Sequence, residues 1–117
     1  MEKLIEKAAL LGVTITENQN KLFDDYYQNI VLRNKTCNLT SILEETEFVD
    51  KHLIDSISGQ KFIGKNLKVC DIGAGAGFPS IPLKIVRPDL DFTLIDSLNK
   101  RVTVLNDTVK LLGLSNI

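Results

Sequence analysis

Apolar residues in the first half of the chain recur at the spacing of amphipathic helices, in three separate stretches. Residues 1–11 place their apolar side chains on one broad helical face. Thr16 and Gln19 have the spacing of a capping box, which predicts a second helix running to about residue 34. A third helix is expected over residues 45–58. The apolar positions of the second and third helices are Leu22, Phe23, Tyr26, Tyr27, Ile30, Val31, Phe48, Val49, Leu53 and Ile57.

The pattern changes after residue 60, where strand-like runs alternate with helical ones. In order, they are a strand at 67–72, a helix at 79–86, a strand at 92–96 and a helix whose inward face is Val102, Leu105, Val109 and Leu112. Alternating strands and helices form parallel sheets with right-handed crossovers. We therefore expect an α/β fold with N-terminal helices at 1–60, followed at 61–117 by the first βαβα units of a Rossmann-like sheet.

Two strands are too few for such a sheet, because doubly wound sheets usually contain about five or more. Residues 114–117 are expected to open a third strand, and the sheet therefore looks truncated. A fragment of this kind is expected to form homo-oligomers through its open sheet edge, where backbone groups stay unpaired. One interpretation of the chain is then a non-catalytic fragment that folds and binds a partner.

Composition places the chain among ordinary globular proteins. It has 117 residues, of which 44% are hydrophobic and 25% charged, and no apolar run approaches the roughly 20 residues that span a bilayer. A cytoplasmic protein with no membrane partner is expected. The formal net charge of −1 gives no overall attraction to nucleic acid. Contacts with phosphates, or else solvated helix faces, are the two interpretations of Lys84, Arg87, Lys100 and Arg101.

Cysteine and histidine give no sign of a metal site. The two cysteines, Cys37 and Cys70, form no Cys-x-x-Cys pair, and we expect both to be reduced, with Cys70 packed in the core. The single histidine, His52, has no metal-ligating partner in the sequence. Tyr26 and Tyr27 could stack on bases, but their place in the apolar stripe favours core packing.

The loop between the first strand and its helix carries the strongest chemical signal. Glycines in such a loop expose backbone amides to a ligand at the positive N-terminus of a helix. Gly73 and Gly75 match the first two glycines of the nicotinamide-binding pattern G-x-G-x-x-G, but Phe78 stands at the third. Gly77 comes one residue earlier, and Asp71 precedes the first glycine by two residues. The resulting D-x-G-x-G-x-G resembles motif I of the class I S-adenosylmethionine-dependent methyltransferases.

An acid near the loop suits S-adenosylmethionine, because that cofactor carries a cationic sulfonium and an ammonium group but no pyrophosphate. Asp71 supplies such an acid. Asp96 ends the second strand, 25 residues further on, where the acid of a Rossmann unit accepts hydrogen bonds from ribose hydroxyls. The alternatives are an NAD-dependent oxidoreductase, and a structural turn in which Asp96 merely caps the next helix.

Further motifs extend the resemblance over residues 38–117. They are Asn38-Leu39-Thr40, His52-Leu53-Ile54-Asp55-Ser56, Asp71-Ile72-Gly73-Ala74-Gly75-Ala76-Gly77-Phe78-Pro79-Ser80-Ile81-Pro82-Leu83 and Asp96-Ser97-Leu98-Asn99-Lys100-Arg101. With these motifs the chain resembles the N-terminal part of the bacterial small-subunit ribosomal RNA guanine-N7 methyltransferase family, also called glucose-inhibited division protein B. The resemblance implies methyl transfer from S-adenosyl-L-methionine to N7 of a guanine in small-subunit ribosomal RNA.

The resemblance also implies roles for particular residues. Cofactor binding is implied for Asp71, Gly73, Gly75, Gly77, Phe78 and Asp96. A place in the cleft, next to cofactor or RNA, is implied for Asn38, His52, Asp55 and Arg101. The alternative for His52 and Asp55 is a pair on the surface of their helix. No catalytic residue is assigned, because guanine N7 has a free lone pair and its methylation removes no proton.

Overall fold

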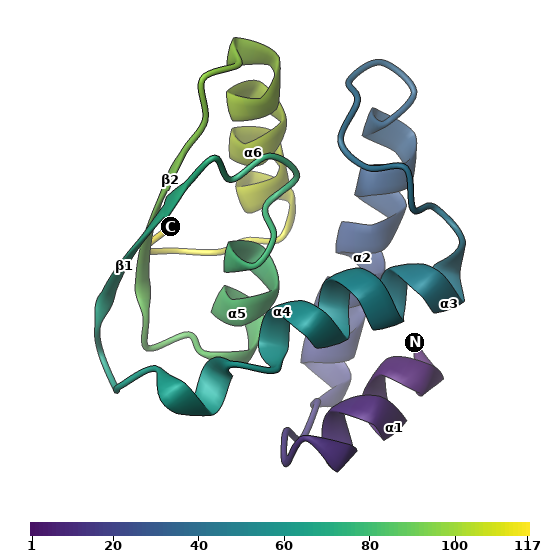
Figure 1. The fold of residues 1–117 in the computed structure, drawn as a ribbon, viewed down its shortest axis with the longest axis vertical. Coiled ribbons are helices and arrows are strands. Elements are labelled where there is room, and N and C mark those ends of the chain that lie inside the picture. The colour runs from purple at the N-terminus through teal and green to yellow at the C-terminus, as the bar shows by residue number, and fades with distance from the viewer.

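The helices gather on one side of a two-stranded sheet (Figure 1). The computed structural model describes residues 1–117. Its elements are, in chain order, α1 (Glu2–Leu10), α2 (Glu17–Arg33), α3 (Glu45–Phe48), the π-helical turn η1 (Val49–Ile54), α4 (Asp55–Ile57), the 3-10 turn η2 (Gln60–Phe62), β1 (Lys68–Ile72), α5 (Ser80–Val86), β2 (Asp91–Ile95) and α6 (Asn99–Leu111). None of these helices is long and apolar enough to cross a bilayer. The expected α/β fold, with helices first and parallel strands after them, is confirmed.

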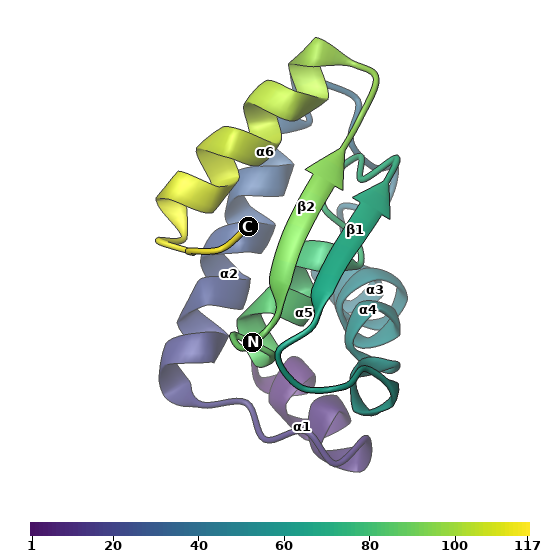
Figure 2. The same ribbon diagram turned by 90° about the vertical axis from the view of Figure 1, so that its left-hand side faces the viewer.

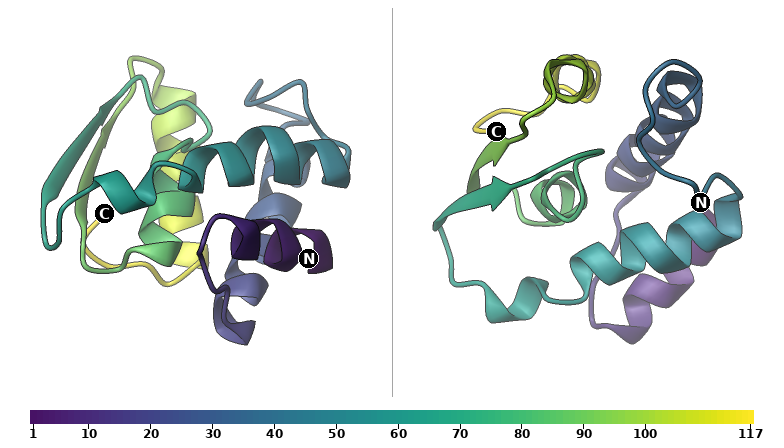
Figure 3. Two further views of the ribbon diagram at one scale, coloured as in Figure 1. Left: turned by 60° about the horizontal axis from the view of Figure 1, so that its bottom comes forward. Right: turned by 45° about the horizontal axis from the view of Figure 1, so that its top comes forward.

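The N-terminal helices form where the apolar pattern predicts them. Both bonds of the capping box are present, because the Gln19 N–H donates to Thr16 Oγ1 at 3.1 Å and the Thr16 N–H donates to Gln19 Oε1 at 3.0 Å. The third stretch is a continuous rod in which η1 separates α3 from α4, and Figure 3 shows this rod beside α1. The four apolar positions predicted for the rod are buried, namely Phe48, Val49, Leu53 and Ile57.

The two strands pair in parallel, and only one face of their sheet carries helices. Cys70 lies opposite Thr93 in the pairing register. Figure 2 views the sheet from the bare face. Cys70 is exposed there, so its expected place in the core is wrong. Because side chains alternate along a strand, Cys70 shares this face with Ile72, whose exposed fraction is 81%.

The inward face of α6 differs from the predicted one. Leu105 and Leu112 are buried as expected, but Val102 is 37% exposed, and the other buried residues of the helix are Val104 and Thr108. A polar contact with α2 accounts for this orientation, since Asn29 Nδ2 donates to Thr108 Oγ1 at 2.8 Å. A threonine can therefore face inward, which a hydrophobic pattern alone does not predict.

The tail at 114–117 forms no strand, contrary to the prediction. It runs past β2 and makes one backbone hydrogen bond with it, in which the Phe92 N–H donates to the Asn116 carbonyl at 3.0 Å. A ladder requires a repeated series of such bonds. The sheet of this chain therefore has two strands.

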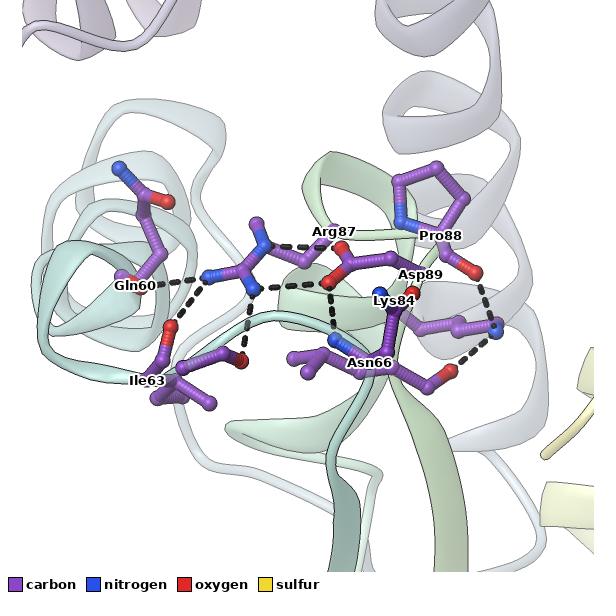
Figure 4. Close-up of polar contacts among 9 residues, drawn as sticks. Gln60, Ile63, Asn66, Lys84, Arg87, Pro88 and Asp89 are labelled. Atoms are coloured by element: carbon purple, nitrogen blue, oxygen red, sulfur yellow. Dashed lines mark hydrogen bonds and ion pairs between the residues drawn. The ribbon is translucent and has the colours of Figure 1, made fainter.

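Arg87 ties the segment before β1 to the turn before β2 (Figure 4). Its guanidinium forms two parallel bonds with the Asp89 carboxylate, each 2.9 Å long. It also donates to the carbonyl oxygens of Gln60, Ile63 and Gly64 at 2.8, 2.9 and 3.0 Å. All five donors of the guanidinium are thereby engaged within the chain. Neither interpretation of Arg87 fits, because no donor is left for a phosphate and the guanidinium is bound within the chain instead of lying on a solvated face.

Lys84 is also structural. Only 4% of the residue is exposed, and its ammonium donates to the carbonyl oxygens of Pro88 and Leu90 (Figure 4). Neither interpretation of the sequence fits this residue, since it is neither on a solvated face nor available to phosphate. The physical reason is that the tight connection between α5 and β2 leaves carbonyl groups that need a donor.

We predict that Asp89→Asn lowers the free energy of unfolding at neutral pH, because an amide cannot form charge-assisted bonds with Arg87. The hydrogen bonds from Arg87, followed by the Asn66 N–H, hold the pKa of Asp89 well below its usual value of 3.8. A depressed pKa stabilises the folded state above the unfolded-state pKa and loses that effect as the pH falls. Urea denaturation should therefore show a gap between native protein and variant that narrows below about pH 4. A gap of equal size at neutral and acidic pH would contradict this assignment.

Candidate functional site at the glycine loop

The loop that joins β1 to α5 folds over the carboxyl ends of both strands. The N–H groups of Gly73 and Ala74 both donate to the carbonyl of Ile95, the last residue of β2, at 2.7 and 3.0 Å. The Gly75 N–H donates to Asp96 Oδ2 at 2.9 Å. The end of one strand and the acid after the next strand thus hold the loop in place.

Gly75 and Gly77 are required for different reasons. Both have positive φ angles, +57° and +101°, which favour glycine over residues with a side chain. A Cβ built on Gly75 would meet nothing within 4 Å, so the backbone there faces open space. A Cβ on Gly77 would lie 2.6 Å from Ile81 Cδ1 and 3.1 Å from Tyr26 Oη. Gly77 therefore permits close packing, whereas Gly75 leaves room above the loop.

Asp96 anchors the loop as a buried carboxylate, with a side chain that is only 3% exposed. Its Oδ1 accepts from the Leu98 N–H at 2.9 Å, and its Oδ2 accepts from Gly75. Arg101 Nη1 lies 3.8 Å from Oδ2. The N–H groups of Leu98 and Gly75, and then the charge of Arg101, hold the pKa of Asp96 below its usual range. Asp96 therefore supports the turn before α6 and the glycine loop together. The alternative that it merely caps the helix is wrong, because the N-cap residue of α6 is Leu98.

Asp71 connects β1 to the start of α5. Its Oδ2 accepts from the Ser80 hydroxyl at 2.6 Å, and Ser80 is almost completely buried. Its other oxygen makes no hydrogen bond within the chain. Asp71 thus fixes the far end of the loop and retains one carboxylate oxygen for another partner.

The N-terminal helices support the loop from the opposite side. The Tyr26 hydroxyl donates to the Ala76 carbonyl at 2.7 Å, and burial raises the pKa of Tyr26 well above its usual value. Phe78 packs against Tyr26 and Phe48, with both ring centroids 5.7 Å away. The His52 ring lies flat on Phe78 at a centroid distance of 4.2 Å and an interplanar angle of 9°. Core packing is therefore confirmed for Tyr26.

Six residues expected at the cofactor site lie together in the loop and at the strand ends, namely Asp71, Gly73, Gly75, Gly77, Phe78 and Asp96. Two of the four expected cleft residues reach them, His52 through Phe78 and Arg101 through Asp96. The side chains of Asn38 and Asp55 are exposed and make no hydrogen bond with this group.

Thr40 also belongs to the site, although it is not among the four residues expected in the cleft. Its Oγ1 lies 2.7 Å from His52 Nε2 and accepts from the Ile42 N–H at 3.0 Å. Burial lowers the pKa of His52, and the charge of Asp55 opposes that shift. The only sequence signal for Thr40 was its place in the 38–40 motif, because the contact joins residues 12 positions apart.

If the functional site were chosen by cavity volume alone, it would lie away from the glycine loop. The largest hollow, about 700 Å³, lies at the opposite end of the sheet and is lined by residues such as Lys61, Asn66 and Asp89. A smaller groove of about 400 Å³ lies beside Phe78 and contains Asp55. We favour the glycine loop because it combines charge, open backbone and close packing, which the larger hollow does not.

A model of the family described as rRNA small subunit methyltransferase G matches residues 19–117. The chain belongs to this family. The match covers the glycine loop and most of the helices that support it, and it confirms the resemblance found in the sequence. The family match gives no support to the alternative of an NAD-dependent oxidoreductase.

Three relatives, each named ribosomal RNA small subunit methyltransferase G, illustrate the similarity. The protein of Desulforamulus reducens is 52% identical over 116 residues, which cover 97% of this chain and 48% of the relative. That of Limosilactobacillus reuteri is 48% identical over 110 residues, covering 91% and 46%. That of Staphylococcus epidermidis is 47% identical over 119 aligned positions, covering 100% and 50%. The chain thus spans about half the length of the curated relatives it matches.

We predict that Gly77→Ala destabilises the chain more than Gly12→Ala does. Both residues have positive φ, so alanine at either position costs about 1–2 kcal/mol of backbone strain. Only at Gly77 does the added methyl group overlap Ile81, and overpacking of this kind adds about 1–3 kcal/mol. Urea denaturation measures both losses. Equal losses would mean that the loop does not pack closely on α5.

Proposed function

We propose that the full-length protein carrying this chain is an S-adenosyl-L-methionine-dependent methyltransferase that acts on N7 of a guanine in small-subunit ribosomal RNA. The observation that carries the proposal is the Gly75 N–H on the Asp96 carboxylate, within a family of small-subunit rRNA methyltransferases. Under this proposal, residues 61–117 form the first part of a Rossmann-like class I methyltransferase domain, and residues 1–60 form a helical region before it.

The residues present fit S-adenosylmethionine. Added Cβ atoms at Gly73 and Gly75 meet nothing within 4 Å, so a ligand can approach the backbone there. Asp71 has an unpaired carboxylate oxygen for a cationic group. Asp96 is assigned to the site as the carboxylate that holds the Gly75 backbone, because a side chain that is 3% exposed presents little surface to a ribose hydroxyl. Gly77 and Phe78 would shape the loop around the cofactor.

The proposed chemistry places few demands on acid–base groups. The bound cofactor supplies a methyl group on a cationic sulfur. Guanine N7 attacks with its own lone pair, so no side chain has to remove a proton. The task of this chain is then to bind, orient and shield the reactants, and alignment of that kind can contribute up to about 7–11 kcal/mol.

The remaining expectations follow from the same proposal. Small-subunit ribosomal RNA is the partner, and an enzyme acting on bacterial ribosomal RNA works in the cytoplasm. We assign Asn38, His52, Asp55 and Arg101 to the cleft region. Self-association of the 117-residue chain through the exposed edge of β1 stays a prediction.

A matched pair of glycine substitutions tests the proposal. Gly75 and Gly113 have similar positive φ angles, +57° and +64°, and neither has an atom within 4 Å of an added Cβ. In the full-length protein, Gly75→Ala and Gly113→Ala should therefore lose similar stability. Only Gly75→Ala should weaken cofactor binding in calorimetry, by about tenfold or more, since it alone obstructs the loop.

The same proteins are then given labelled cofactor and small-subunit RNA that lacks the modification. Nucleoside analysis should detect 7-methylguanosine with the native protein and with Gly113→Ala, and much less with Gly75→Ala. Label in another nucleoside, or no label at all from a native protein that is folded, would overturn the proposed function. Equal cofactor affinities in the two variants would overturn the assignment of the loop.

A further inference from the structure

The stack of His52 on Phe78 lies directly after the last glycine of the loop. Phe78 follows Gly77 in the chain, and its ring is enclosed by Tyr26, Phe48 and His52. Of these three contacts, only the one with His52 is parallel and within 5 Å. The orientation of the His52 ring therefore affects the position of Phe78, the residue that follows the last glycine of the loop.

The backbone of His52 is fixed by an unusual local winding. His52 lies in the π-helical turn η1, and such turns occur frequently at functional sites. The Asp55 N–H and the Ser56 hydroxyl both donate to the carbonyl of His52. Any shift of the His52 backbone along the helix axis would therefore break both hydrogen bonds.

The ring of His52 is fixed separately, through Thr40. The hydrogen bond between Thr40 Oγ1 and His52 Nε2 restrains rotation of the imidazole about its Cβ–Cγ bond. Thr40 is in turn held by Asn34, whose Oδ1 accepts from the N–H groups of Leu39 and Thr40 at 2.8 and 3.0 Å. The end of α2 thereby sets the position of Thr40, and Thr40 sets the plane of the imidazole.

Two other roles for His52, as a metal ligand and as a general base, have less support in the structure. A metal site needs several ligands, and the chain brings no group of three histidine, cysteine or acidic side chains together. A general base has no proton to remove in methylation of guanine N7. A ring that is held at one nitrogen and packed flat on a neighbour is suited to hold that neighbour in place.

We propose that Thr40 and His52 are positioning residues, which act through Phe78 to hold the glycine loop in the shape that binds the cofactor. The inference rests on the proposed function, because Phe78 and the loop are there assigned to S-adenosylmethionine. Neither residue needs to touch cofactor or RNA. The chain of contacts runs from Asn34 through Thr40 and His52 to Phe78.

The test uses the full-length protein with Thr40→Val, which removes the hydroxyl but keeps the branched shape. Thr40→Ser restores the hydroxyl, and Thr36→Val is the control, since Thr36 donates only to the Arg33 carbonyl at 3.4 Å. For Thr40→Val, the dissociation constant and the KM of the cofactor should rise about five- to tenfold, with kcat changed less than twofold. Thr40→Ser and Thr36→Val should stay within about twofold of the native protein.

A second measurement needs no cofactor. His52 is the only histidine of these 117 residues, and its ring signals are identified by NMR as those that disappear in His52→Phe. The native ring should show the upfield shift of a proton above an aromatic face. Thr40→Val should reduce that shift and speed hydrogen exchange in the loop, whereas Thr36→Val should not. His52→Phe, which keeps a flat ring, should preserve more cofactor affinity than His52→Ala.

The outcomes separate the two proposals. A native protein that binds no cofactor, yet whose loop loosens in Thr40→Val, would refute the proposed function and leave the positioning of the loop intact. A native protein that binds cofactor, with Thr40→Val equal to Thr36→Val in affinity, would overturn the role of Thr40 and His52. If Thr40→Val fails to fold, the comparison of His52→Phe with His52→Ala decides, and equal affinities there also overturn the inference.

Discussion

The hydrogen bond from the Gly75 N–H to Asp96 joins the loop after β1 to the end of β2. Its acceptor is a carboxylate that is almost fully buried, and burial of a charge is costly unless donors compensate it. The N–H groups of Gly75 and Leu98 provide that compensation, with Arg101 close by. The parallel register of the strands, the path of the loop and the start of α6 must all be correct for these donors to meet.

The helical region takes part in this arrangement rather than standing apart from it. Tyr26 donates to the Ala76 carbonyl, and the ring of Phe78 enters the aromatic cluster around Phe48. One buried core of 17 residues includes members from both halves of the chain. The loop is thus held by an acid on its sheet side and by aromatic residues on its helical side, so that its shape is set before a ligand arrives.

Local patterns predicted much of this structure, because they depend on residues a few positions apart. The capping box of Thr16 and the spacing of Gly73, Gly75 and Gly77 are of this kind. Contacts between residues far apart in the chain could not be predicted from these local patterns. The roles of Lys84 and Arg87 depend on carbonyl groups in other segments, and the exposure of Cys70 depends on which face of the sheet the helices cover. Likewise, Thr40 could not be paired with His52 before the path of residues 34–42 was known.

Hydrogen exchange at the Gly75 amide tests most directly whether Asp96 holds the loop. The account predicts slow exchange of this amide in the native protein. In Asp96→Ala it should exchange at least about tenfold faster, while amides in the middle of α2 keep their rates. An amide of Gly75 that exchanges freely in the native protein, or at the same rate in both proteins, would contradict the account.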